Sequence, residues 1–299
     1  MGCCENTPPV FVCAMDVIRH SDPEAFAELA FPVYEADPVR HTTALTVLDS
    51  ILGRGRDDVL MITVLREGAV AGCAFRTPPW PLIASALPVG THRVVQDFLV
   101  GNGIPLGGVL APREVADPFI TLWTEMTGQA PDYTLGLRLH RLGEFTPQTA
   151  PGRFRPVEPR DIDLIGEWWA AFEDEESGGL RQIDGQAEAR RAMENPMRRF
   201  GLWLDEDGTP VSMAGGSAPL SGMSRLGPVY TPKEHRGRGY GSAVTAALTQ
   251  WALDEGARDV LLYTDVTNPV SNAIYHRIGY RPVLEAVEHR VPDANTLRG

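Results

Sequence analysis

The stretch that most constrains this chain is residues 225–242, RLGPVYTPKEHRGRGYGS, because it joins a strand to a helix through a glycine-rich turn. Residues 226–230 form an apolar, partly β-branched run of strand length, and Thr231-Pro232 ends it. Residues 242–255 then carry apolar side chains at the helical period. The amides of a helix's first turn have no intrahelical partner, and the helix dipole is positive there. This arrangement predicts an anion site at the turn.

The residue types in the turn indicate a guest with a pyrophosphate. Gly237, Gly239 and Gly241 let the backbone approach a bulky diphosphate that a Cβ would hold away, and Arg236 and Arg238 add positive charge beside it. Spacing argues against two other phosphate sites. The chain has no G-x-x-x-x-G-K-[ST], and the run GRGYG lacks the full dinucleotide pattern G-x-G-x-x-G.

A second motif follows the helix and gives the first one a family context. The pattern R-x-x-G-x-G, formed by Arg236, Gly239 and Gly241, resembles motif A of the GNAT-type N-acetyltransferase superfamily. Residues 259–264 read as a buried strand, and residues 268–280, NPVSNAIYHRIGY, have a spacing that resembles motif B of the same superfamily. The resemblance covers residues 153–291, about half of the chain.

The resemblance implies a fold and an acyl donor. The expected fold is α/β, with a mixed, mostly antiparallel central sheet flanked by helices. The donor would be acetyl-CoA, with no metal. Its diphosphate would lie on the amides of residues 237–242, and its pantetheine arm would pair with Val229 and Thr231 where their strand splays from the next one. The expected cofactor-binding residues are Val229, Tyr230, Thr231, Arg236, Gly237, Arg238, Gly239, Tyr240, Gly241, Ser242, Asn268 and Ser271.

The second motif also supplies a candidate acid. Ser271 is expected to cap a short helix that Gly279 ends, and Tyr275 lies on that helix. By the resemblance, Tyr275 would give a proton to the CoA thiolate; a phenol with a pKa of about 10 stays protonated at neutral pH. The alternative is that Tyr275 only packs. Asn268 would bind pantetheine or open an Asn-Pro turn.

The sequence identifies the general base less clearly than the acid. An acidic run at residues 173–176 ends a predicted helix in a region that often lines the acceptor pocket of this superfamily, and from it we select Glu173 and Glu176 as catalytic candidates. Such a run is also typical of a solvated helix end. Asp265 and His235 are further candidates. The residues that could wall an acceptor site, or belong to the core instead, are Trp168, Trp169 and Phe172.

The amino-terminal half repeats the same order of elements: helix, helix, hairpin, strand, helix, strand, helix. Its phosphate turn is degenerate, since GTHRVVQ stands where the other half has RGRGYGS. We therefore expect a tail at 1–14, a degenerate GNAT-like domain at 15–142, a linker at 143–153 and a catalytic domain at 154–299. Such tandems with a decayed first half resemble actinobacterial GNAT proteins.

The expected elements of the first half are helices at 21–34, 42–52, 92–100 and 115–127 and strands at 59–65, 69–76, 82–88 and 104–110. Ser21 is the expected cap of the first of these helices. The expected elements of the second half are helices at 161–172, 186–193, 242–255 and 271–278 and strands at 200–204, 210–218, 226–230 and 259–264.

The net charge and the cysteine spacing narrow the classes of partner that we expect. A net charge of −12 disfavours nucleic acid and anionic membranes, and suits a cationic small-molecule or peptide amine as acceptor. The four cysteines lack metal-site spacing, so we expect a reduced, cytoplasmic protein. We also expect the protein to be monomeric or weakly dimeric. Three functions stay open: an N-acetyltransferase, a CoA-binding sensor or scaffold without turnover, and an acyltransferase for longer acyl-CoA.

Overall fold

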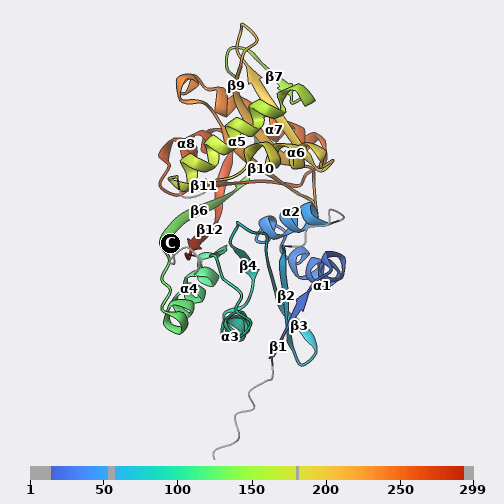
Figure 1. Cartoon of the computed structure of the whole chain (residues 1–299). Coiled ribbons are helices and arrows are strands. Elements are labelled where there is room, and N and C mark those ends of the chain that lie inside the picture. Colours follow the sequence, from blue (N-terminus) through green and yellow to red (C-terminus); the bar gives the residue numbers. More distant parts are fainter. Residues whose placement is uncertain (1–14, 53–57, 180–181, 293–299) are drawn as a thin grey trace, which may run out of the picture.

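The protein consists of two bodies joined through their β-strands. The computed structural model describes residues 15–52, 58–179 and 182–292. The expected tail at 1–14, with Cys3, Cys4 and Cys13, lies outside these residues. Strands β6 (Tyr133–Leu142) and β12 (Tyr280–Arg290) run between the bodies (Figure 1).

The same order of elements occurs in both halves, which confirms the predicted internal repeat. The first half contains β1 (Met15–His20), α1 (Pro23–Glu35), α2 (Thr42–Ile51), β2 (Leu60–Arg66), β3 (Ala69–Arg76), β4 (Leu82–Ala86), η1 (Val89–Thr91), α3 (His92–Gly101), β5 (Val109–Pro112), α4 (Arg113–Thr127) and β6. The second half contains β7 (Arg153–Pro156), η2 (Pro159–Asp161), α5 (Ile162–Ser177), α6 (Gly185–Glu194), β8 (Arg198–Leu204), β9 (Pro210–Ser217), β10 (Met223–Tyr230), η3 (Lys233–His235), α7 (Tyr240–Asp254), β11 (Asp259–Asp265), α8 (Pro269–Ile278) and β12.

The described strands form one sheet, and each half closes the sheet of the other. Their order is β1-β2-β3-β4-β5-β12-β6-β11-β10-β9-β8-β7. Strand β6 of the first half pairs with β11, and β12 of the second half pairs with β5, both antiparallel. Between them β6 and β12 pair along their whole lengths. Two units divided at the predicted boundary of 142/143 therefore exchange their last strands.

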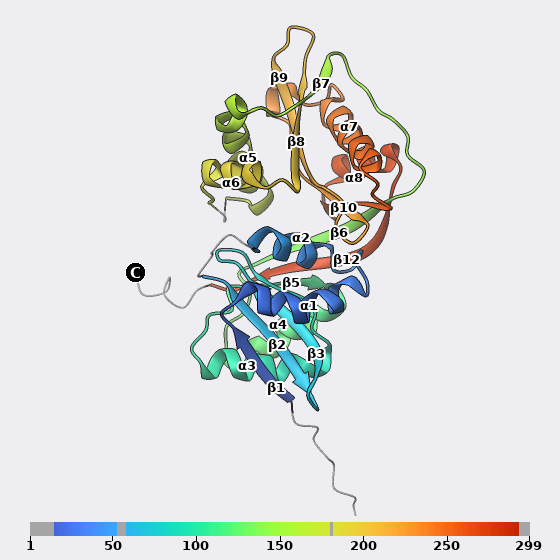
Figure 2. The same cartoon turned by 90° about the vertical axis from the view of Figure 1, so that its right-hand side faces the viewer.

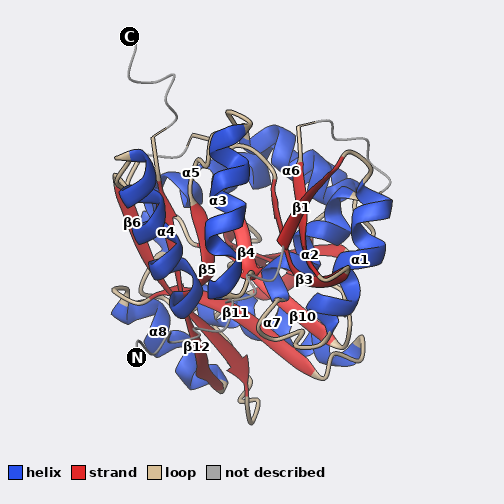
Figure 3. Cartoon of the chain, turned by 90° about the horizontal axis from the view of Figure 1, so that it is seen from below, coloured by secondary structure: helices blue, strands red, loops and turns tan. Residues whose placement is uncertain are grey.

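The helices lie on both faces of this sheet (Figures 2 and 3). The core beneath α1 and α2 includes Met223 and Leu261 of the second half, so these two helices also cover part of the second half's sheet. Helices α5 and α6 continue on the same face over β8 and β9. Helices α7 and α8 pack on the opposite face of β9, β10 and β11. Helix α2 therefore stands beside β10, on the face away from the glycine-rich turn's helix.

The sequence-based expectations fail at several element ends for local reasons. Asp22, and not Ser21, is the N-cap of α1 and accepts from the Glu24 amide at 3.1 Å. The strand expected at 104–110 starts only at Val109, since Gly107 and Gly108 take positive φ values of 64° and 137° before it. Strands β1, β6, β7 and β12 were not anticipated.

Candidate functional site

Strands β10 and β11 separate in the middle of the second half. They pair in parallel from Met223 opposite Asp259 to Leu226 opposite Leu262, and the ladder ends there. Beyond this point β10 stays on β9, with a register irregularity between Leu226 and Val229. Strand β11 meanwhile stays on β6 up to Asp265. The facing edges of the two strands thus diverge from Gly227 onward, and leave backbone polar groups that an extended ligand could pair with.

The strand β10 leads directly to the predicted anion turn. Gly237 and Gly239 have φ values of +77° and +85°, and a Cβ added at Gly237 would meet nothing within 4 Å. Gly239 is the N-cap of α7, whose first intrahelical bond runs from the Ala243 amide to the Gly239 carbonyl at 3.0 Å. The amides that precede Ala243 in the helix have no intrahelical acceptor, as at any helix start.

Two further features at this helix start fit an anion. The Ser242 hydroxyl oxygen is buried and, among the described residues, has no hydrogen-bond partner. A Cβ at Gly241 would stand 3.1 Å from Thr231 Oγ1, so glycine keeps the approach to the turn open. The Tyr240 side chain is buried in the core, which leaves its backbone amide as the part of the residue at the turn. The donor set suits a phosphate group.

Arg236 connects the turn to the acidic end of α5. Its Nε donates to the Thr231 carbonyl at 2.8 Å, and its Nη2 lies 2.7 Å from Glu175 Oε2. The guanidinium also sits 5.7 Å from the centre of the Tyr230 ring. Lys233 is 3.9 Å from the same Glu175. The acidic run therefore reaches the turn, through Glu175 rather than through the selected Glu173 or Glu176. Arg238 is exposed.

The charge of Glu176 on α5 acts on Tyr275 of α8. The Tyr275 side chain is buried, and its ring packs edge-on against Tyr280 with centroids 6.2 Å apart. Burial, and secondarily the charge of Glu176, raise the pKa of the Tyr275 phenol well above its ordinary value. The phenol is therefore fully protonated at neutral pH. Glu173 is buried on the same helix as Glu176.

The start of α8 is organised differently from the prediction. Asn268, and not Ser271, is the N-cap, and its Oδ1 accepts from the Ser271 amide at 3.1 Å. The side chain of Asn272 holds the preceding turn by donating to the carbonyls of Asp265 and Asn268 at 3.0 and 2.7 Å. Thr264 Oγ1 donates to Asn272 at 2.9 Å. These contacts favour a structural role for the Asn268 side-chain oxygen.

Strand β6 of the first half adds a residue that the sequence did not indicate. His140 is buried, and its Nε2 lies 3.0 Å from Thr264 Oγ1. Burial lowers the pKa of His140, so the ring is neutral at neutral pH. The strand exchange is what brings this residue next to β11, and no local pattern around residue 140 could have revealed it.

The remaining candidates are mainly structural. Asp265 accepts from both the amide and the hydroxyl of Thr267, at 2.7 and 2.8 Å, and so shapes the turn after β11. Trp168 is buried with its ring 6.3 Å from that of Tyr230, and Trp169 packs 5.4 Å from Phe200. The Nδ1 atom of His235 is buried without a hydrogen-bond partner in the described chain, and Phe172 is half-buried.

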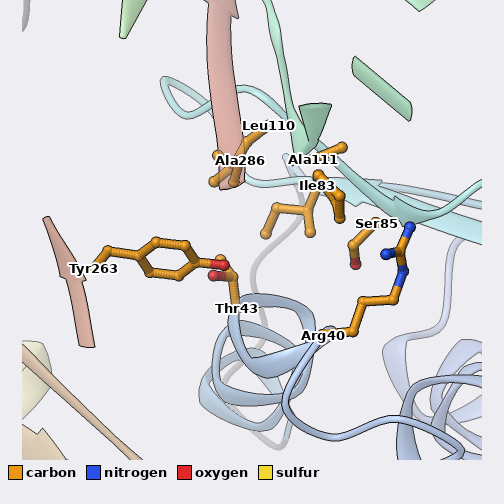
Figure 4. Close-up of a pocket in the computed structure, with 9 residues that line it drawn as sticks. Arg40, Thr43, Ile83, Ser85, Leu110, Ala111, Tyr263 and Ala286 are labelled. Carbon is orange, nitrogen blue, oxygen red and sulfur yellow. The ribbon is translucent and has the colours of Figure 1, made fainter. Parts of the chain in front are cut away.

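A small pocket lies where α2 meets strands of both halves. Figure 4 shows Tyr263 of β11 pointing toward Thr43, and Arg40 pointing toward Ser85. Arg40 is 2.7 Å from Glu114, so its charge already has a partner. His41 Nδ1 lies 2.9 Å from Ser85 Oγ, and burial lowers the pKa of His41 to about 4. We assign no ligand to this pocket.

Two kinds of feature are absent from the residues that the structure describes. None of their helices combines the length and the apolar character that crossing a bilayer requires. No three His, Cys, Asp or Glu side chains among them gather closely enough to hold a metal ion.

Known proteins resemble the second half in sequence and the whole chain in structure. Residues 163–280 match the model of the family described as "Acetyltransferase (GNAT) family". A Bacillus subtilis protein named "Uncharacterized N-acetyltransferase YobR" is 29% identical over 90 residues, which are 30% of this chain and 36% of that protein. The chain thus matches only about a third of the length of this relative.

Two solved structures extend the likeness to both halves. The first is a GCN5-related N-acetyltransferase from Sphaerobacter thermophilus, with a TM-score of 0.59 at 18% identity over 92% of this chain and 95% of that one. The second is described as a tandem GNAT protein from the clavulanic acid biosynthesis pathway, with a TM-score of 0.56 at 12% identity over 94% and 100%. At these identities the likeness establishes the fold, a tandem of two such units.

Proposed function

Because residues 163–280 form an acetyltransferase domain of the GNAT family, we propose that the protein moves an acetyl group from acetyl-CoA directly to a primary amine of a small molecule or peptide. The observation that carries the proposal is the continuity of two features. The divergence of β10 and β11 after Leu226 leads without interruption to the unpaired amides at the start of α7. A diphosphate bound at those amides places an extended arm along the open edge of β10.

The chain's own groups then orient the reactants. The open edge near Val229 and Thr231 offers backbone hydrogen bonds to an amide-containing arm, and the amides of residues 237–242 hold its phosphates. The acyl end would lie beside Leu226 and Gly227, where the strands begin to part. Holding thioester and amine in one place removes most of the entropic cost of their encounter.

Proton movements fall to groups on α8 and α5. Tyr275 remains protonated through the neutral range because burial raises its pKa, so its hydroxyl is an available proton donor for the departing thiolate. Glu173 and Glu176 are the carboxylates proposed to take the proton of the amine, with Glu176 the one whose charge acts on Tyr275. The two roles lie on separate helices that pack on opposite faces of the sheet.

The first half supports this site without repeating it. Its helix α3 follows η1 without a glycine turn, and the buried His92 at its start uses Nε2 on the Leu87 carbonyl at 3.2 Å. We propose one acyl-donor site, in the second half. Because β6 and β12 already make an internal pseudo-dimer, we also propose a monomer or weak dimer, acting in the cytoplasm without nucleic acid or membrane.

The experiment that tests the function is CoA release. Purified protein is mixed with acetyl-CoA and a panel of amines, and free thiol is followed with a thiol-reactive dye while calorimetry measures acetyl-CoA binding. We expect binding together with amine-dependent thiol release. Binding without release for every amine would favour the sensor or scaffold, and absence of binding would exclude both readings.

A further inference from the structure

Two arginines lie at the point where β10 and β11 part. Arg198, the first residue of β8, donates from Nη2 to the Gly227 carbonyl at 3.0 Å. Arg225 of β10 donates from its backbone amide to Ser217 Oγ at 3.0 Å, and Ser217 is the residue paired with Arg198 across β8 and β9. The two arginines therefore flank one residue of β9, next to Gly227.

Both guanidinium groups lie on the face that α2 covers. The Arg225 guanidinium donates from Nη2 to Thr46 Oγ1 of α2 at 2.7 Å. Thr46, Arg198 and Ser217 all line a small pocket between α2 and the ends of β8 and β9, and Asp49 lines it as well. One wall of this pocket thus comes from the first half of the chain and the other from the second.

The charges of these two arginines are not balanced by ion pairs. Within the described chain, neither Arg198 nor Arg225 has a carboxylate within ion-pair distance, whereas Arg40 and Arg155 elsewhere pair at 2.7 and 2.8 Å with acidic partners. Burial, followed by repulsion from Arg225, lowers the pKa of Arg198 to about 10. Burial also lowers the pKa of Arg225. At neutral pH both groups stay charged, so two like charges are held together in a partly desolvated place.

A bound oxyanion would offset the repulsion between two such guanidinium groups. A guanidinium carries five N–H donors in a planar fork that matches the geometry of carboxylate and phosphate oxygens. Arg198 donates from one guanidinium nitrogen to the Gly227 carbonyl, and Arg225 donates from two to Thr46 Oγ1. No hydrogen bond within the described chain occupies their other guanidinium nitrogens, which leaves these donors for a ligand.

We propose that Arg198 and Arg225 bind an oxyanion, a carboxylate or a phosphate, carried by the acyl acceptor. This inference rests on the proposed function, because the acyl end of the donor would lie beside Gly227, which Arg198 contacts. The acceptor is then an amine whose own negative charge anchors it, such as an α-amino acid, a peptide with a nearby carboxylate, or an aminoalkyl phosphate. It replaces the cationic acceptor that the net charge of the chain suggested.

The first test needs only the wild-type protein. Thiol release is compared within matched pairs: the common α-amino acids against their carboxamides, and ethanolamine phosphate against ethanolamine. Charge-assisted hydrogen bonds from two arginines predict a kcat/KM about 10- to 100-fold higher for the anionic member. The series with the larger preference identifies the oxyanion. Equal or better turnover of the neutral members in both series would overturn the proposal.

Substitutions assign the effect to these side chains. Arg198→Gln and Arg225→Gln should raise KM for the anionic amine about 10- to 100-fold more than KM for the neutral amine. Arg199→Gln is the matched control, because Arg199 is the exposed neighbour on the same strand, with its guanidinium 5.6 Å from the Trp251 ring. An equal loss for both members of a pair would mean that the arginines only hold the sheet together, and the proposal would fail.

A binding measurement separates this inference from the acetyl transfer itself. Acetate and inorganic phosphate should raise the Tm of the wild type and of Arg199→Gln more than that of Arg198→Gln. If no amine is acetylated, the proposed function fails, and the thermal shift alone decides on the anion site. If neutral amines are acetylated and no shift depends on Arg198, only the anion site is refuted.

Discussion

A charge reversal at Gly239 tests the diphosphate site against a control on the same helix. Gly239 precedes α7 at φ +85°, and a Cβ there would meet only Ala150 Cβ, at 3.6 Å. Gly256 lies just beyond the other end of α7 at φ +89°, with nothing within 4 Å of an added Cβ. Gly239→Glu and Gly256→Glu therefore introduce the same side chain, the same net charge and the same backbone conformation. They differ in which end of the helix receives them.

The structure predicts a larger cost in binding for Gly239→Glu and a somewhat larger cost in stability for Gly256→Glu, because the helix dipole favours a carboxylate at the N-terminus of α7 and disfavours one at its C-terminus. A non-glycine residue in the left-handed region loses about 1–2 kcal/mol, and neither site adds a collision. A carboxylate about 4 Å from a phosphate charge costs about 4 kcal/mol at the effective dielectric of a protein surface, which is about 10³-fold in affinity. Salt screening reduces this figure, so we expect a loss of about 10²- to 10³-fold for Gly239→Glu.

The assay is calorimetric titration with acetyl-CoA at fixed ionic strength, with thermal unfolding of all three proteins alongside. Gly256→Glu should bind within about twofold of the wild type, although it should lose at least as many degrees of Tm as Gly239→Glu. Wild-type affinity in Gly239→Glu would refute the placement of the phosphates. An equal loss of affinity in Gly256→Glu would show that general destabilisation, and not charge at the turn, is responsible.

Three further predictions follow from single contacts. Tyr275→Phe should lower kcat about 10²-fold with little change in KM if its hydroxyl donates a proton, and an unaltered rate would leave Tyr275 a packing role only. Burial lowers the pKa of His41 to about 4, so the unfolded chain binds its proton first as pH falls below about 6.5. His41→Gln should therefore remove about 3 kcal/mol of the stability lost between pH 6.5 and 4, as measured by urea unfolding. Gly279→Ala should destabilise the protein by about 3 kcal/mol, because φ is +117° and the added Cβ would lie 2.0 Å from the Glu144 carbonyl oxygen. Gly128→Ala is the control: φ there is +74° and nothing lies within 4 Å of the added Cβ, so it should cost about 1 kcal/mol in the same assay.

The sequence was most informative about features whose residues are contiguous in the chain. The strand, the glycine turn and α7 are contiguous, so their spacing predicted the turn at residues 236–242 and the helix that follows it. The internal repeat was visible for the same reason. Gly279 ends α8 as expected, with φ +117°. Each of these features depends on hydrogen bonds between residues near one another in the chain.

What the sequence did not reveal depends on pairing between distant segments. Strand β6 alternates apolar and polar residues, but this pattern does not indicate that it pairs with β11 and β12 rather than with β5. His140 lies next to Thr264 because of that exchange, although the two residues are 124 positions apart in the chain. Arg198 and Arg225 likewise look like ordinary strand-end charges until the sheet places them on either side of Ser217. Side-chain sites formed by cross-strand neighbours have no local signature.

The exchanged strands explain why a half without a phosphate turn is an integral part of the site. Strand β6 closes the edge of β11, and α2 covers the face of β10 that carries Arg225. A second half alone would expose that edge and lose Thr46, one wall of the pocket in which we place the acceptor. The first half need not bind an acyl donor in order to matter for transfer. Its sequence is constrained by the surface of α2 and by the register of β6, and the acceptor specificity of the protein should therefore respond to substitutions in a half that holds no phosphate turn.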